Sequence, residues 1–253
     1  MHSRVRLKLT IAYDGTNYEG WQVQKVGVGV QQKIEEAIAK IFQEQIRLHG
    51  SSRTDTGVHA RAMIAHFDIP DERLRMDISK VPLALNAQLP EDIRIMEAHR
   101  APDSFHARFS AKGKQYRYFV LNHPSMYPLL RQQAWHVPVK LDLAAMRKAV
   151  NHFKGKKDFA AFANNRNYEM ETTVRTVFRC ELRKAGPLLT FLIEGDGFLY
   201  KMCRGIVGTV VQVGMGKFKE SDILRMLATK DRCMAGMTAP AHGLILWKVF
   251  YES

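Results

Sequence analysis

The polar segment from Gly50 to Ala60 places an arginine and a carboxylate where they can act together. It reads Gly-Ser-Ser-Arg-Thr-Asp-Thr-Gly-Val-His-Ala and lies between two apolar runs, 46–48 and 63–69, that predict strands. Arg53 and Asp55 are separated by one residue, so an extended backbone points both side chains to the same side. A guanidinium keeps a nearby carboxylate ionised, and such a carboxylate can act as a base or a nucleophile. An ordinary turn, in which the aspartate bonds to backbone amides before a glycine, is the alternative.

A second segment, 104–118, interleaves arginines and lysines with aromatic side chains. This composition is typical of surfaces where nucleobases stack and phosphates are neutralised. Tyr116 and Tyr118 are two positions apart on a predicted strand and therefore share one face. If that face belongs to the core, both tyrosines are packing residues instead.

A third segment, 199–213, predicts an apolar helix that contains Arg204. Because an unpaired charge in an apolar setting is costly, we expect Arg204 to meet an anion, with Asp55 as the candidate. A helix-surface arginine in solvent is the alternative. Leu244 precedes a closing strand, where a core leucine is the default interpretation. Trp21, between a glycine and a glutamine, either contacts a base or anchors its loop on the core.

The elements that must position these residues predict an α+β chain. Strict alternation predicts a half-buried strand over 5–11, and apolar residues at helical spacing predict helices. The expected helices are 31–42, 79–89, 142–153, 199–213 and 221–228, and the further strands are 93–95, 175–183, 188–193 and 245–251. This order fits helices on one face of a largely antiparallel sheet.

Two further stretches are basic. Arg175, Arg179 and Arg183 recur on one strand and predict a basic row on its polar side. Residues 154–158 and 164–167 are expected to form a mobile basic tail, which either grips nucleic-acid phosphates or is simply a solvated face.

The whole chain carries a strong excess of positive charge. Its 253 residues include 38 lysines and arginines against 25 aspartates and glutamates, a net charge of +13, and 46% are apolar. The length suffices for one large domain or two modest ones with a real core. The charge favours a polyanionic partner, and nucleic acid is the leading candidate.

Cysteine and hydropathy patterns exclude several other classes of protein. Cys180, Cys203 and Cys233 are far apart, and the ten histidines show no zinc-like spacing, so we expect reduced thiols and no metal site. No apolar run reaches the about 18 residues of a membrane span, and residues 1–10 alternate basic and apolar side chains unlike a signal peptide. We therefore expect a soluble, cytoplasmic protein.

Separated strings between Tyr13 and Leu244 agree, in order, with one family. They are Tyr-Asp-Gly-Thr at 13–16, Gly-Trp-Gln at 20–22, Arg-Thr-Asp-Thr-Gly-Val-His at 53–59, Phe-His-Ala-Arg at 105–108, Lys-Gln-Tyr-Arg-Tyr at 114–118, Phe-Leu-Tyr-Lys-Met-Cys-Arg at 198–204 and Ala-Pro-Ala-His-Gly-Leu at 239–244. Nearly the whole chain thus resembles the TruA family of tRNA pseudouridine synthases. Cys203 departs from the branched aliphatic residue usual in that family, a small change of volume.

The resemblance implies the pseudouridine synthase fold, with two similar α+β halves and largely antiparallel sheets around a central basic cleft. The expected halves are 1–105, with the aspartate loop, and 106–253, with the stacking tyrosine and the arginine helix. The implied activity is isomerisation of uridine to pseudouridine at positions 38 to 40, in the anticodon stem-loop of tRNA. No metal or cofactor is implied, and the family works as a homodimer with one tRNA across both subunits.

The resemblance also assigns roles to individual residues. It makes Asp55 the catalytic carboxylate, paired with Arg204. Arg53, which lies two positions before this carboxylate in the sequence, is a further candidate to keep it ionised and to bind the substrate. It places Tyr116 against the target uracil, where stacking contributes about 1–3 kcal/mol, and Leu244 beside the flipped base. Whether the carboxylate attacks the base or the sugar stays open.

Three other functions compete with this interpretation. A non-catalytic RNA-binding protein shares the charge and the aromatic residues, but gains nothing from an arginine-paired aspartate. A metal-dependent phosphodiesterase needs clustered acids, and no second carboxylate is near Asp55 in the sequence. A different branch of pseudouridine synthases keeps the aspartate but not the string at 53–59.

Overall fold

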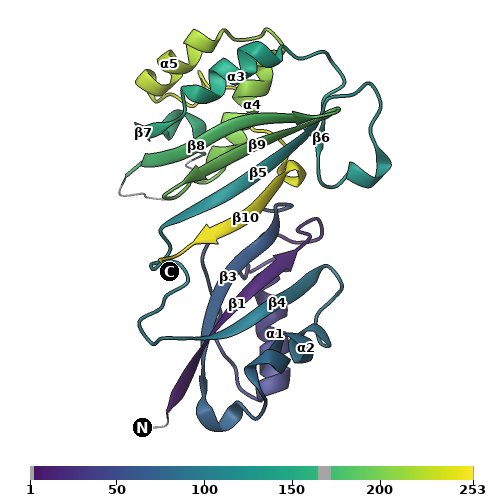
Figure 1. The fold of residues 1–253 in the computed structure, drawn as a ribbon, viewed down its shortest axis with the longest axis vertical. Helices are drawn as coiled ribbons and strands as arrows, with labels where there is room; N and C mark the ends of the chain where they lie inside the picture. The colour runs from purple at the N-terminus through teal and green to yellow at the C-terminus, as the bar shows by residue number, and fades with distance from the viewer. Residues whose placement is uncertain (1–2, 165–171, 253) are drawn as a thin grey trace. The chain divides into compact units, whose positions relative to one another are not determined.

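The structure is a computed structural model that describes residues 3–164 and 172–252 (Figure 1). The chain divides into two compact units, Met1–Lys112 with Leu246–Ser253, and Gly113–Ile245. These units differ from the expected halves, 1–105 and 106–253, because the last strand returns to the first unit. Hydropathy along the chain carries no information about such a return. The predicted α+β class with a largely antiparallel sheet is confirmed.

The first unit is built on strands that pair mainly antiparallel. Its strands are β1 (Arg4–Tyr13), β2 (His49–Gly50), β3 (His59–Pro70), β4 (Ile93–Ala101) and most of β10 (Leu244–Phe250). They follow the order β4-β1-β3-β10, and β2 pairs with β3. Two helices, α1 (Val30–Phe42) and α2 (Val81–Asn86), lie on one face of these strands (Figure 1).

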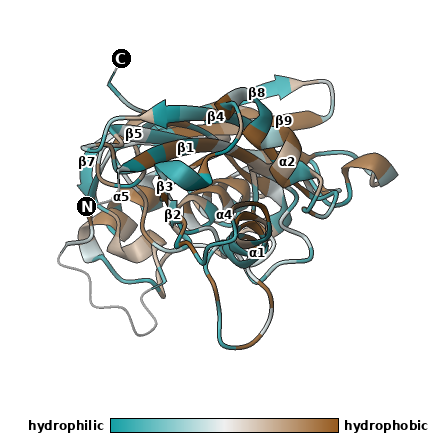
Figure 2. Cartoon of the chain, turned by 90° about the horizontal axis from the view of Figure 1, so that it is seen from below, coloured by the Kyte–Doolittle hydropathy of each residue, from teal (hydrophilic) through white to brown (hydrophobic). Residues whose placement is uncertain are grey.

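Strand β1 pairs with β3 on one side and β4 on the other, and its residues alternate strictly between apolar and polar. Its apolar residues Val5, Leu7, Leu9 and Ile11 are at most 2% exposed, whereas the basic and polar residues between them face away. In Figure 2 the strands accordingly change between hydrophilic and hydrophobic colours along their length. Helix α1 packs on the apolar face, where the rings of Phe42 and Phe67 lie 6.0 Å apart. The predicted strand at 5–11 and helix at 31–42 are confirmed.

The second unit has its own antiparallel strands. They are β5 (Gly113–Leu121), β6 (Trp135–His136), β7 (Gly155–Asp158), β8 (Val174–Ala185) and β9 (Leu188–Gly195). Strand β9 pairs with β5 and β8, β7 pairs with β8, and the short β6 runs parallel to β5. The expectation of a mobile tail at 154–158 was wrong, because 155–158 pairs with Val174–Val177. Residues 165–167 of the second expected stretch lie outside the described residues.

Three helices pack together in the second unit: α3 (Leu143–Asn151), α4 (Met202–Gly214) and α5 (Glu220–Thr229) (Figure 1). Helix α4 is buried along most of its length. A Cβ atom at Gly205 or Gly208 would overlap the backbone carbonyls of Phe162 and Met237, so these glycines permit a close approach. Helix α4 therefore forms part of the core of this unit.

Short 3-10 helices join the main elements. They span Asp71–Arg73, Ile78–Lys80, Pro128–Leu130, Ala160–Phe162 and Ala241–Gly243. The helix expected over 79–89 is shorter in the structure, because a 3-10 turn forms first and α2 ends at Asn86. The three cysteines are unpaired, as expected. Within residues 3–164 and 172–252, every helix is too short or too polar to cross a membrane.

Candidate active site

Asp55 lies in the loop that connects β2 to β3. Gly57 adopts a φ of 75°, in the left-handed region that glycine enters without strain, and it closes the turn. The backbone N–H of Val58 donates to the Asp55 carbonyl at 3.1 Å. The Asp55 side chain is half-buried, and Arg53 is exposed. One loop thus presents a partly desolvated carboxylate together with a guanidinium that reaches solvent.

The loop that follows β1 holds the aspartate loop in place. The hydroxyls of Tyr13 and Thr54 share a buried hydrogen bond of 2.8 Å. The Thr54 carbonyl accepts from the Trp21 N–H at 3.2 Å, and the Gly57 N–H donates to the Tyr18 carbonyl at 3.3 Å. The backbone is therefore fixed on both sides of the carboxylate, as a catalytic group requires.

Trp21 anchors its loop rather than facing solvent. Its side chain is 2% exposed and packs against Gly50, where an added Cβ would lie 2.5 Å from the indole nitrogen. Of the two interpretations left open by the sequence, the structure supports the anchoring role.

A buried histidine adds a second connection between the two loops. His59 is 4% exposed, and its Nδ1 accepts a hydrogen bond from the Gly15 N–H at 3.0 Å. The same nitrogen lies 3.0 Å from Asp14 Oδ1, so a neutral ring accepts from Gly15 and a protonated ring donates to Asp14. Burial would raise the pKa of Asp14, but hydrogen bonds from Thr16 and the neighbouring imidazole hold the pKa below its usual value. This positioning role was not predicted from the sequence, although the string at 13–16 marked the segment.

In the second unit, Tyr116 lies on β5. Its side chain is 7% exposed, and its ring meets Phe198 edge-on with centroids 5.3 Å apart and an interplanar angle of 89°. Tyr118, two positions along, is fully buried. Both tyrosines thus contribute to packing, and the role of Tyr116 as a base-stacking residue stays a prediction.

Arg204 lies in the first turn of α4 and is half-buried. Its Nε donates to the Ala239 carbonyl at 2.8 Å, and its own carbonyl accepts from the Ala239 N–H at 3.0 Å. The Tyr118 hydroxyl donates to the next carbonyl, that of Pro240, at 2.8 Å. Burial raises the pKa of Tyr118, and the positive charge of Arg204 opposes this rise. Helix α4, strand β5 and the 239–240 segment therefore meet.

Leu244 follows this segment at the start of β10 and is 6% exposed. A Cβ at the preceding Gly243 would lie 2.5 Å from the Tyr118 ring, so the segment also packs on β5 here. The structure thus gathers Arg204, Leu244 and the strand that carries Tyr116 within the second unit. It gathers the two residues of the aspartate loop within the first unit. The pairing of carboxylate and Arg204 stays a prediction.

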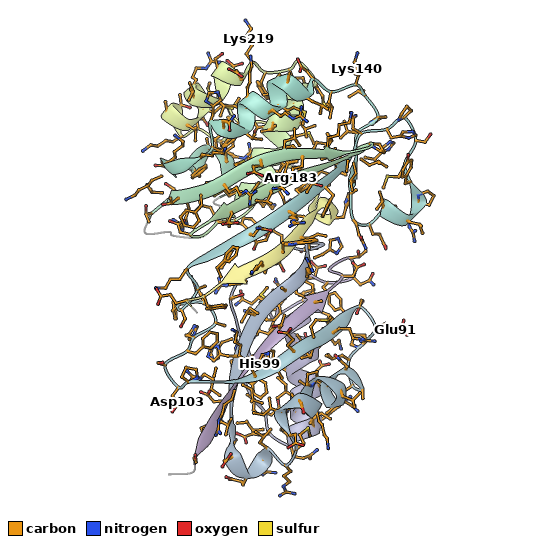
Figure 3. All side chains as sticks on the ribbon, in the orientation of Figure 1. Glu91, His99, Asp103, Lys140, Arg183 and Lys219 are labelled. Carbon is orange, nitrogen blue, oxygen red and sulfur yellow. The ribbon has the colours of Figure 1, made fainter. Side chains whose placement is uncertain are left out.

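The expected basic row on β8 is partly neutralised. Arg179 Nε lies 2.6 Å from one oxygen of Glu181, and Arg183, labelled in Figure 3, lies 3.1 Å from the other. Hydrogen bonds from Arg179 hold the pKa of Glu181 below its usual value. Two of the three arginines therefore share a carboxylate, and the row is less cationic than its arginine count implies. Over the part of the chain that is described, no group of three or more His, Cys, Asp or Glu is arranged to hold a metal ion.

Comparison with known proteins identifies similar sequences along almost the whole chain. The family model described as tRNA pseudouridine synthase matches residues 9–110 and 149–252. The chain is 43% identical over 243 residues to tRNA pseudouridine synthase A of Thermoanaerobacter sp. (strain X514), covering 96% of this chain and 98% of that protein. It is 44% identical over 247 residues to the enzyme of the same name from Ruminiclostridium cellulolyticum. The match covers 97% of this chain and 99% of that protein. With the tRNA pseudouridine synthase A of Bacillus pumilus (strain SAFR-032) the identity is 42% over 251 residues, and the match covers 98% of this chain and 100% of that protein.

Proposed function

Because this chain belongs to the tRNA pseudouridine synthase family, we propose that it isomerises uridine to pseudouridine at positions 38 to 40, in the anticodon stem-loop of tRNA. The chain is an isomerase, like its relatives, and tRNA is its substrate class. The net charge of +13 supports a polyanionic substrate. One observation supports an aspartate-dependent reaction most directly. The Asp55 side chain is half-buried, and hydrogen bonds hold the backbone of its loop on both sides of it.

The reaction needs no net change of composition. The bond between ribose C1′ and uracil N1 breaks, the base turns, and a bond forms between C1′ and C5. The C5 proton leaves, and N1 gains a proton. Asp55 serves as the covalent nucleophile or as the base that assists glycosidic cleavage, and both roles require the ionised carboxylate.

The other site residues act on the flipped base and on the carboxylate. Arg204 pairs with Asp55 and keeps it ionised, which agrees with the partial burial of both side chains. Tyr116 stacks on the target uracil and Leu244 packs beside it, since removing a base from its stack costs a few kcal/mol. Arg53, exposed on the same loop as the carboxylate, contacts the RNA.

A homodimer with one tRNA across both subunits belongs to the same proposal. Light scattering of the purified protein at assay concentration tests it, and the proposal expects twice the chain mass of 28.9 kDa. A monomeric mass together with full activity would defeat this part.

Site-resolved mapping of pseudouridine in an unmodified tRNA transcript tests the proposed substrate. Wild-type protein in buffer with chelator and no added cofactor should modify uridine at positions 38 to 40. A matched transcript with cytidine at these three positions should yield no product. Pseudouridine elsewhere in both transcripts would contradict the assigned position while keeping the reaction class. Activity that a chelator abolishes would instead favour a metal enzyme.

A non-catalytic RNA-binding protein was the alternative that the sequence alone left open. It would bind the transcript with a salt-dependent affinity and form no pseudouridine under any condition. The assay therefore needs a binding measurement beside it, so that absent product is not confused with absent substrate binding.

A further inference from the structure

The chain leaves β4 through a rigid loop, residues 102–111, which we call the 102–111 segment. Its own hydrogen bonds form a compact turn: Phe105 N–H donates to the Pro102 carbonyl at 2.9 Å, and Ser110 N–H donates to the His106 carbonyl at 2.9 Å. The Ser110 hydroxyl in turn accepts from the His106 N–H at 2.9 Å. The segment is therefore ordered by internal bonds and not only by its ends.

Side chains of the first unit fasten this segment to the sheet. At its centre Ala107, which is fully buried, donates its N–H to His66 Nδ1 at 3.2 Å and accepts from the Tyr251 hydroxyl at 2.6 Å. Arg6 donates to the Phe105 carbonyl at 2.7 Å, and also to the carbonyl of Asp103, which is labelled in Figure 3. The backbone that precedes residues 108 and 109 is thus fixed on both sides.

A series of rings runs from the sheet to the surface of this segment. His49 and His66 stack with centroids 5.0 Å apart, His66 meets His106 at 4.7 Å, and His106 meets Phe109 at 4.3 Å. The last ring, Phe109, is 75% exposed. An aromatic side chain carries 150–250 Å² of apolar surface, so exposing it on a rigid loop forgoes a large stabilisation. Such a ring is preorganised for a ligand.

The nearest charge identifies the chemistry of that ligand. The Arg108 guanidinium is exposed and lies 5.5 Å from the centroid of the Phe109 ring. His106 Nδ1 accepts from the N–H groups of both Arg108 and Phe109, at 3.1 and 3.3 Å, which fixes the two residues relative to each other. Within residues 3–164 and 172–252, no carboxylate pairs with this guanidinium. The surface thus offers an exposed aromatic ring with an exposed guanidinium beside it.

We propose that Phe109 and Arg108 form an RNA contact separate from the Asp55 loop, in which a nucleobase of the bound tRNA stacks on Phe109 and Arg108 binds the adjoining phosphate. The contact holds a base that is not isomerised, and it rests on the proposed function because it takes tRNA as the substrate. A planar base with its phosphate matches one ring beside one cation. A protein partner would instead need about 800 Å² of interface on each side.

Variants of Phe109 test the stacking. For Phe109→Ala, the dissociation constant and the KM for tRNA should rise about 5- to 140-fold, as expected for the loss of one stacked base. The kcat at saturating tRNA and the melting temperature should stay at their wild-type values, because the ring is exposed. Phe109→Trp, which keeps a π face, should restore binding. Leu129→Ala, at a side chain that is 90% exposed, is the matched control and should bind as wild type.

The salt dependence of tRNA binding tests the phosphate contact. Arg108→Gln should reduce the log–log salt slope by about 0.7 to 0.9, the value for one neutralised phosphate, and Phe109→Ala should leave the slope unchanged. Wild-type binding and KM in Phe109→Ala, with an active wild-type enzyme, would overturn the RNA contact alone. A change of oligomeric mass in that variant with unaltered tRNA binding would reassign the ring to a subunit contact. A wild-type protein that neither binds nor modifies tRNA would refute the proposed function itself.

Discussion

Acidification should destabilise the first unit through His66, whose side chain is 2% exposed. Burial is the largest cause that lowers its pKa from 6.5 to about 4, and cationic neighbours act in the same direction. Those neighbours are His106, His49 and Arg6, while Asp68 acts in the opposite direction. The pKa of His106 is lowered as well, mainly by burial. The imidazoles of His66 and His106 are therefore held in the neutral form at pH 7.

The sign of the effect follows from proton uptake. Between pH 6.5 and about 4 the unfolded chain binds a proton at this imidazole and the folded chain does not, so stability is complete above pH 6.5 and falls as the pH is lowered. A difference of about 2.5 units corresponds to about 3 kcal/mol. Lowering the pH from 7.5 to 4.5 covers only about 2 of these units, so we expect a loss of about 2 kcal/mol or slightly more.

The variant His66→Asn isolates this contribution, because its side-chain oxygen can still accept from the Ala107 N–H. The free energy of unfolding is measured with urea for both proteins between pH 7.5 and 4.5. On acidification it should fall by about 2 kcal/mol more in the wild type than in the variant. His99→Asn, at an imidazole that is 65% exposed and labelled in Figure 3, is the control and should follow the wild type. Parallel curves for His66→Asn and wild type would refute the reasoning, as would an NMR titration of His66 near 6.5.

Three further predictions concern the aspartate loop and the RNA. Tyr13→Phe removes the buried bond to Thr54, so kcat should fall several-fold at a nearly constant KM, and thermal unfolding should show a loss of about 1 kcal/mol; an unchanged kcat would contradict the positioning role. Gly50→Ala places a Cβ 2.5 Å from the Trp21 indole nitrogen, so we expect a destabilisation of about 1–3 kcal/mol in denaturant. The control Gly197→Ala should cost much less, because its added Cβ would lie no closer than 3.6 Å to a residue that is not its neighbour in the chain. Binding of tRNA, measured by filter retention, should weaken with salt at about 0.7 to 0.9 per neutralised phosphate, and a flat response would count against a cationic tRNA site.

Local patterns predicted those elements that alternate or repeat over many residues. Strand β1 and helix α1 match their expected ranges closely, because one face of each is continuously apolar. Strand β7 was missed because its four residues, Gly-Lys-Lys-Asp, carry no hydrophobic alternation. Pairing with β8, and not propensity, makes this segment a strand.

Contacts between distant residues could not be read from spacing. The Tyr13–Thr54 bond joins residues 41 positions apart, and the bond between Gly15 and His59 joins residues 44 apart. Both pairs lie in strings that the family resemblance marked, but only the fold shows that they hold the loop of Asp55.

The partial neutralisation of β8 could have been predicted. Glu181 lies two positions from both Arg179 and Arg183, so all three side chains share one face of a strand. The alternation that predicted a basic row therefore also contained the carboxylate that pairs with two of its members.

The most direct measurement of the central claim is single-turnover pseudouridine formation by wild type and Asp55→Asn, with tRNA binding measured in parallel. Asp77→Asn, at a side chain that is 79% exposed, serves as the control. We predict that all three proteins bind the transcript similarly, that wild type and control form pseudouridine at positions 38 to 40, and that Asp55→Asn loses more than about 10²-fold in rate. Equal product from wild type and Asp55→Asn would remove this carboxylate from the chemistry.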